Sequence, residues 1–208
     1  MKKIMMIAAM MVAAVSANAQ NEVGQWTLMP KAGINISTIT GDGPQKSKVG
    51  FVGGAEFEVG LAEKFGLDFG LLYSMEGCKY PAADFVNFYI PGAGNLVDGN
   101  ANFNFDYINI PILAQYYLAK GFAIKAGLQP AFNVRHKVSY NGESVNSKDL
   151  GIDVNAFNLS IPVGLSYEYK SFVLDVRYNI GVTKIVKDEK GNNSTFAITL
   201  GYKIPLNK

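Results

Sequence analysis

Acidic and basic residues stand at alternating positions in several segments of this chain, mostly between apolar neighbours. The clearest segment is 172–184, where even positions up to 182 are apolar and Asp175 and Arg177 occupy odd positions. Six acids and five bases share this placement: Glu56, Glu58, Asp68, Glu76, Glu168, Asp175, Lys31, Lys125, Arg135, Arg177 and Lys203. Because a period of two is that of a strand, we expect these charges on one face of a sheet.

Other residue types that could do chemistry are few and are not spaced for it. Nucleophilic catalysis needs a nucleophile and a base within reach of each other. The one histidine, His136, has Ser139 and Ser74 in the same predicted outer zone, but no spacing links them. Asp98-Gly99-Asn100-Ala101-Asn102 resembles the start of a calcium loop, yet Phe103 replaces the turn glycine and the distal Glu is missing. We therefore predict no catalytic, cofactor or metal site.

Eight segments alternate in this way, and they are the elements that would position the charges. They are residues 26–37, 49–61, 65–75, 105–118, 122–134, 157–169, 172–184 and 194–204. Long and short connections between them alternate, as periplasmic turns and outer loops do in outer-membrane proteins. The sequence thus predicts an all-β fold, an eight-stranded antiparallel transmembrane up-and-down β-barrel. Pro111 is awkward within a strand because proline lacks a ladder donor.

The first residues of the chain have the pattern of an export signal. Lys2 and Lys3, the apolar run 4–15 and Ala17-Asn18-Ala19 form the three parts of a signal peptide. We predict a signal peptide at 1–19, a barrel domain at 20–208 and a location in the outer membrane.

The composition excludes some other partners and folds. Without the two signal lysines, the chain has 17 basic and 17 acidic residues, and this balance argues against a nucleic-acid partner. The alternative fold is a soluble lipocalin-like barrel, whose interior would be apolar. Cys78, the one cysteine, cannot form an internal disulfide.

The sequence also resembles the small outer-membrane β-barrel family of Bacteroidota, called PorT-like or OmpA/OmpX-like. The resemblance covers essentially the whole mature chain, and it implies the barrel and its location but no particular activity. The segments that carry it are Ala19-Gln20, 31–35 with Ser37, 107–111, 126–130, 161–164 and 175–181. The end of the chain departs from this family, whose members often finish on an aromatic residue, whereas this chain finishes on Lys208.

The predicted function follows from the size of the barrel. Eight strands leave an interior that side chains fill, and buried charges there must pair because an isolated buried ion is very costly. We predict a lumen closed by charges and a non-catalytic structural or interaction role through the outer loops. Partners would be outer-membrane lipid and an extracellular ligand or protein, with the chain a monomer. The alternatives are a narrow porin for small solutes or an accessory component of protein secretion. The apolar run 85–90 would be a contact surface, a cover for the barrel mouth or an extension of the third hairpin.

Overall fold

The computed structural model describes residues 22–41, 44–89, 98–186 and 191–207. Within them lies one sheet of eleven strands that closes on itself, because β10 pairs with β1. The strands are β1 (Trp26–Thr40), β2 (Lys46–Ala62), β3 (Phe65–Pro81), β4 (Asn100–Asn109), β5 (Ile112–Ala119), β6 (Phe122–Tyr140), β7 (Glu143–Asn146), β8 (Phe157–Tyr169), β9 (Phe172–Lys184), β10 (Asn192–Tyr202) and β11 (Ile204–Pro205). The predicted signal peptide lies outside the described residues.

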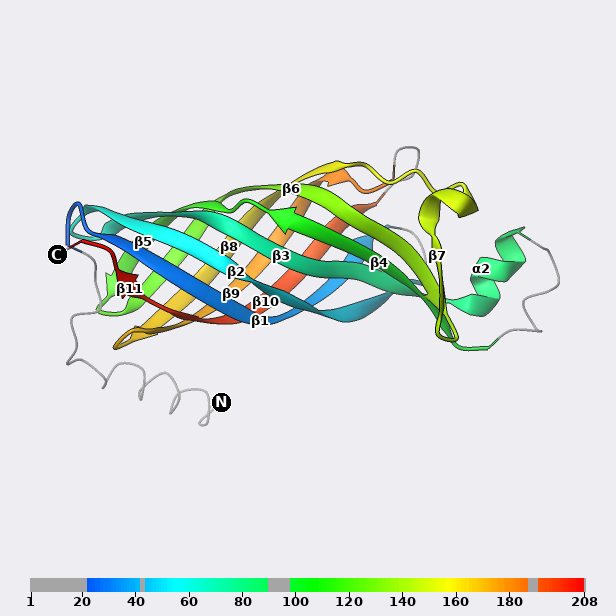
Figure 1. Ribbon diagram of the computed structural model, residues 1–208, viewed down its shortest axis with the longest axis horizontal. Helices are drawn as coiled ribbons and strands as arrows, with labels where there is room; N and C mark the ends of the chain where they lie inside the picture. The colour runs from blue at the N-terminus through cyan, green and yellow to red at the C-terminus, as the bar shows by residue number, and fades with distance from the viewer. Residues whose placement is uncertain (1–21, 42–43, 90–97, 187–190, 208) are drawn as a thin grey trace.

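These strands occupy eight positions around a ring, which confirms the predicted barrel (Figure 1). β4 and β5 share one position between β3 and β6, β7 folds back on β6, and β11 pairs with β1 where β10 ends. The described pairings are antiparallel, so the chain passes up and down around the wall. No described helix is long and apolar enough to cross a membrane.

The fourth predicted strand is divided into two. β4 ends at Asn109 and β5 begins at Ile112, so the break falls at Ile110 and Pro111. Proline has no N–H for the ladder, which is the physical reason for the break. The wall nevertheless stays joined there, because Pro111 O accepts from Gly70 N at 3.2 Å and Ile110 N donates to Pro130 O at 2.8 Å.

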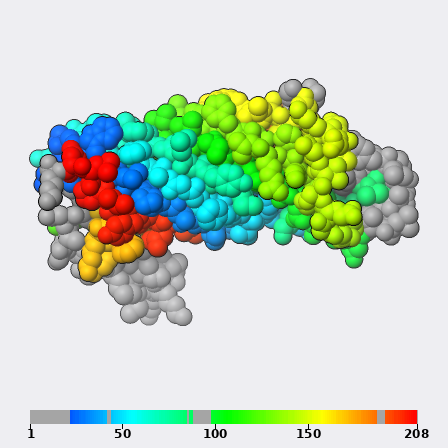
Figure 2. Space-filling model, in the orientation of Figure 1, coloured from blue at the N-terminus to red at the C-terminus, as the bar shows by residue number. Residues whose placement is uncertain are grey.

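The two ends of the barrel differ. At one end the described turns are tight, at 63–64, 120–121 and 170–171, and the first and last described strands meet there (Figures 1 and 2). At the other end three strands run five or six residues further than the sequence pattern predicts: β3 reaches Pro81, β4 begins at Asn100 and β6 reaches Tyr140. We call these added strand ends, with β7 and helix α2 (Ala82–Tyr89), the outer extension. The apolar run that starts at Phe85 is helical, so it does not extend the third hairpin, and Ile90 lies outside the described residues.

The wall has an apolar outer face and a polar inner face. Large apolar side chains such as Phe51, Leu71 and Leu174 are exposed, whereas the carboxylates of Glu56 and Glu58 are fully buried inside. This is the reverse of a soluble protein and is what a barrel surrounded by lipid requires. The charged interior does not fit the lipocalin-like alternative.

Candidate functional site: the charged lumen

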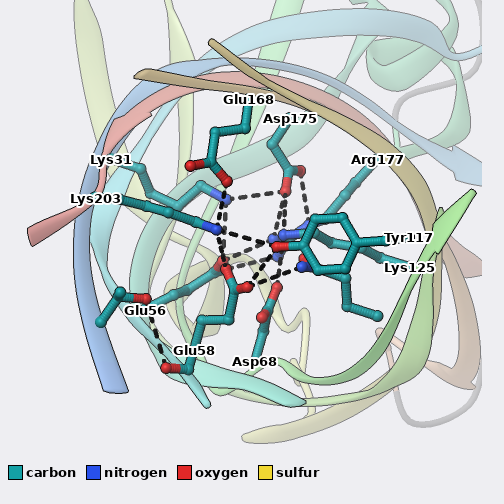
Figure 3. Close-up of polar contacts among 12 residues, drawn as sticks. Lys31, Glu56, Glu58, Asp68, Tyr117, Lys125, Glu168, Asp175, Arg177 and Lys203 are labelled. Atoms are coloured by element: carbon teal, nitrogen blue, oxygen red, sulfur yellow. Dashed lines mark hydrogen bonds and ion pairs between the residues drawn. The ribbon is translucent and has the colours of Figure 1, made fainter. Parts of the chain in front are cut away.

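Arg177, on β9, points into the lumen and forms a two-pronged ion pair with Glu56 of β2. Its Nη1 lies 2.6 Å from Glu56 Oε1, and its Nη2 lies 2.7 Å from Oε2. The same Nη2 donates to Oδ2 of Asp175 at 2.8 Å. Two parallel charge-assisted bonds fix geometry as well as charge. Figure 3 shows these side chains converging from different strands inside the ring.

Two lysines complete this first group of charges. Lys31 Nζ, from β1, lies 3.0 Å from Glu56 Oε2 and 3.3 Å from Asp175 Oδ2. Lys125 Nζ, from β6, lies 2.6 Å from Asp68 Oδ2 and 3.4 Å from Asp175 Oδ2. Asp175 therefore contacts three cations. The ion pairs of this group link side chains from β1, β2, β3, β6 and β9.

A second group lies around Lys203, between β10 and β11. Its Nζ is 2.8 Å from Glu58 Oε2 and 2.6 Å from Glu168 Oε2. Two neutral side chains of β5 donate to the other Glu58 oxygen, Tyr117 OH at 2.7 Å and Gln115 Nε2 at 2.9 Å. Tyr117 was not among the predicted site residues, although its position two residues after Gln115 places it on the same inner face.

Nine of the eleven predicted residues thus lie together, and we call them the lumen charge network. They are Lys31, Glu56, Glu58, Asp68, Lys125, Glu168, Asp175, Arg177 and Lys203, and their side chains are at most 9% exposed. Ions as deeply buried as these are stable only with well-placed partners of opposite charge. The network joins strands far apart in the sequence, and Arg177 and Glu56 are separated by 121 residues.

Arg135 is not in the lumen, so its predicted placement was wrong. A β-bulge interrupts the pairing of β4 with β6 at this point, since Tyr107 pairs with Asn133 but Asp106 pairs with Arg135. The extra residue, Val134, shifts the alternation by one and turns Arg135 to the outer face. There its side chain is 50% exposed and its Nη1 lies 3.6 Å from Asp106 Oδ2. Asp106, which was not among the predicted site residues, also accepts from Tyr73 OH at 2.6 Å.

Glu76 is inside the barrel as predicted but is not part of the network. Its carboxylate accepts from Asn109 Nδ2 at 3.3 Å, from Thr195 Oγ1 at 3.1 Å and from Asn193 Nδ2. Lys48 Nζ bonds the main-chain oxygen of Glu76 at 3.0 Å rather than the carboxylate. Glu76 therefore belongs to a separate, amide-rich level of the lumen.

The remaining candidates for chemistry do not converge. His136 Nδ1 lies 3.0 Å from Asn133 Oδ1, whereas Ser139 contacts Ser144 and Ser74 contacts Asn35. Asp98 Oδ1 accepts from the following main-chain N–H, that of Gly99, as turn residues do, and β4 begins two residues after Asp98. Cys78 is a buried free thiol.

Apolar side chains close the lumen at the end that carries the outer extension. Phe105, Tyr107 and Ala131 from the wall pack against Val154 and Ile185 from the connections beside β8 and β9. A β-bridge between Val154 and Val186 holds the two connections together. We call this cluster the apolar cap. Between it and the network lie two cavities of about 20 Å³ each, and the lining of both includes Asn109, Gln129 and Asn179.

Comparisons with known proteins agree with this architecture. The structure is similar to Ail, the attachment invasion locus protein of Yersinia pestis, with a TM-score of 0.54 and 15% identity over 88% of this chain and 100% of that one. It is also similar to Neisserial surface protein A, with a TM-score of 0.51 and 12% identity over 86% and 97%. No curated protein sequence matches. The family model described as outer membrane protein beta-barrel domain matches residues 18–187, so the chain belongs to that family and is an outer-membrane protein.

Proposed function

We propose that this protein is a closed, non-catalytic barrel that holds a recognition surface outside the outer membrane. The observation that carries the proposal is the double closure of the lumen. The lumen charge network fills one part, and the apolar cap covers the mouth at the outer extension. An eight-stranded barrel has little interior space to begin with. Two lumen cavities lined by described residues measure about 20 Å³ each and hold about one water molecule each.

The outer extension supplies the surface. β6 has 19 residues and β3 has 17, whereas about 9–11 tilted residues cross a bilayer. In Figure 1, β7 and α2 lie beyond the body of the barrel, at the end opposite the tight turns. Side chains on a rigid scaffold of this kind are well placed for binding. One similar structure, of Ail with the heparin analogue sucrose octasulfate, shows ligand binding by that protein, which supports the same general role here.

We propose export by the signal peptide at 1–19, a monomer in outer-membrane lipid, and an extracellular ligand or protein as partner. The kinship with PorT-like barrels of Bacteroidota is also proposed on the sequence resemblance. The narrow porin is the alternative that a conductance measurement separates from the closed barrel, whereas no contact among the described residues favours a part in protein secretion.

Conductance in a planar lipid bilayer tests the closed lumen. We expect the purified protein to insert without a steady ion current, because two barriers separate the polar cavities from the ends of the barrel. An open porin inserted by the same procedure serves as the positive control. A steady current that grows in unit steps with each insertion would contradict the proposal and support the narrow porin.

Labelling of single cysteines tests which end faces outward. Glu143 is exposed on β7, and Lys120 is exposed in the turn between β5 and β6. We expect a membrane-impermeant maleimide to label Glu143→Cys on intact cells and Lys120→Cys only after the membrane is opened. The unmodified protein gives the background, because Cys78 is buried. Labelling of Lys120→Cys on intact cells, with Glu143→Cys protected, would show the opposite orientation.

A further inference from the structure

The carboxylate of Glu76 is buried in the lumen without a cationic partner. The residue is 4% exposed, and no lysine, arginine or histidine nitrogen among the described residues pairs with its carboxylate oxygens, since Lys48 Nζ bonds only its main-chain oxygen. Its hydrogen-bond donors, the side chains of Ser74, Asn109, Thr195 and Asn193, are neutral. The nine residues of the lumen charge network each have an oppositely charged partner, so Glu76 differs from them. A buried ionised carboxylate needs a counterion as well as hydrogen bonds.

A small cavity lies directly beside this carboxylate. It measures about 20 Å³, and its lining includes Glu76, Asn109, Asn179, Asn193 and Thr195. This space accepts one particle of about the size of a water molecule. Apolar side chains such as Ala131 and Leu159 also line the space, so oxygen atoms reach an occupant from one part of the lining.

Two amide oxygens that line the same cavity are buried and accept no hydrogen bond from the described residues. They are Oδ1 of Asn179, a residue only 9% exposed, and Oδ1 of Asn193. The orientation of Asn193 follows from its contact with Glu76, since its Nδ2 donates to that carboxylate. Buried acceptors without donors are rare in folded proteins and call for an occupant. A carboxylate and two such oxygens around one small space form a set of acceptors.

We propose that Glu76, Asn179 and Asn193 hold one sodium ion in the lumen. Oxygen-only ligands select a hard cation, and one carboxylate balances a single positive charge. No group of three or more His, Cys, Asp or Glu side chains placed to hold a metal occurs among the described residues, so the ligand set lacks the charge that calcium prefers. The small volume favours sodium over the larger potassium ion. The site lies between the lumen charge network and the apolar cap, so the ion would enter as the barrel folds and would stabilise its outer half.

Unfolding in different salts tests the site. The purified protein is unfolded and refolded in sodium, potassium or choline chloride at equal ionic strength, so that each cation has access to the lumen. A ligand that binds only the folded state raises its stability by mass action. We expect the thermal midpoint in sodium chloride to exceed that in choline chloride by about 3 °C or more. Equal midpoints in the three salts would overturn the proposal and leave water as the occupant.

Two matched variants assign the effect to Glu76. Glu76→Gln keeps the size and removes the charge, so its midpoint should not depend on the cation. Asp106→Asn removes an acid on the outer face of the wall, and it should keep the sodium dependence of the unmodified protein. If Glu76→Gln does not fold, Asn179→Leu removes one ligand oxygen and should weaken the sodium dependence. A full sodium response in Glu76→Gln or Asn179→Leu would contradict the assignment.

The ion can also be observed directly. Sodium-23 relaxation broadens when the ion exchanges with a protein site. We expect this broadening with the unmodified protein refolded in sodium chloride and not with Glu76→Gln. Equal sodium relaxation with the two proteins would contradict a sodium ion held at Glu76. Neither result depends on whether the barrel conducts, so this test and the conductance test can fail independently.

Discussion

Replacing Arg177 with alanine is expected to lower the free energy of unfolding by about 3–5 kcal/mol, the cost of breaking a buried ion pair from one side. Arg177 bonds both oxygens of Glu56 and also contacts Asp175. Without it, the five acids of the lumen charge network face only three bases. Lys31 still reaches both carboxylates, but one ammonium cannot replace the two-pronged contact.

The measurement is the urea midpoint of the folded barrel in detergent or lipid, followed by its heat-modifiable migration on gels. Arg177→Lys keeps the charge and loses the two-pronged geometry, so its loss of stability should be smaller. Arg135→Ala is the matched control, because this side chain is half exposed on the outer face and its partner Asp106 keeps the hydrogen bond from Tyr73, so its loss should cost less than that of Arg177. If Arg177→Ala and Arg135→Ala had the same small effect, the network would not stabilise the barrel.

Placing arginine at Val163 is expected to cost about 2–4 kcal/mol, because the charge would enter the middle of the lipid-facing wall. Val163 is the seventh of the 13 residues of β8 and is 41% exposed on the outer face. Its neighbours across the ladder are Ala126 on β6 and Tyr178 on β9, so no acid on the outer face would pair with the new charge.

Tyr169→Arg provides the control for this second prediction. Tyr169 is also exposed, but it is the last residue of the same strand, beside the tight turn to β9. Near the interface the cost of a charge falls to about 0–1 kcal/mol. Unfolding in lipid vesicles should therefore separate the two variants. Equal stability of Val163→Arg and the unmodified protein would show that this face is exposed to water.

The lumen charge network also bears on the register of the barrel. A shift of one residue in the pairing of β9 would move Asp175 and Arg177 from the lumen to the lipid-facing side, since side chains alternate with a period of two. The same shift would place Val176 inside. Because an ion in lipid is costly, such a shifted register should be disfavoured by several kcal/mol. We infer that the charges select one register as well as contributing to stability.

The sequence by itself determined the fold class and the inner position of most charges. The alternation at 172–182 is a local property of the sequence. In each such strand the apolar positions share one face, which is the face expected to contact lipid. The order of long and short connections then implied a barrel, because turns at one end of a barrel can be tight. These features need no knowledge of which strands are neighbours.

Only the tertiary structure decided which charges meet. Arg177 pairs with Glu56, although the two residues are 121 positions apart in the sequence. They meet because β10 pairs with β1 and completes the ring. Arg135 lies on the outer face because of a single bulge residue, and the alternating pattern of the sequence does not reveal that bulge. Glu76 fits the same pattern as Glu58, yet one lies among amides and the other beside Lys203. Alternation assigns a side chain to a face, whereas its partners depend on the registers of all eight strands together.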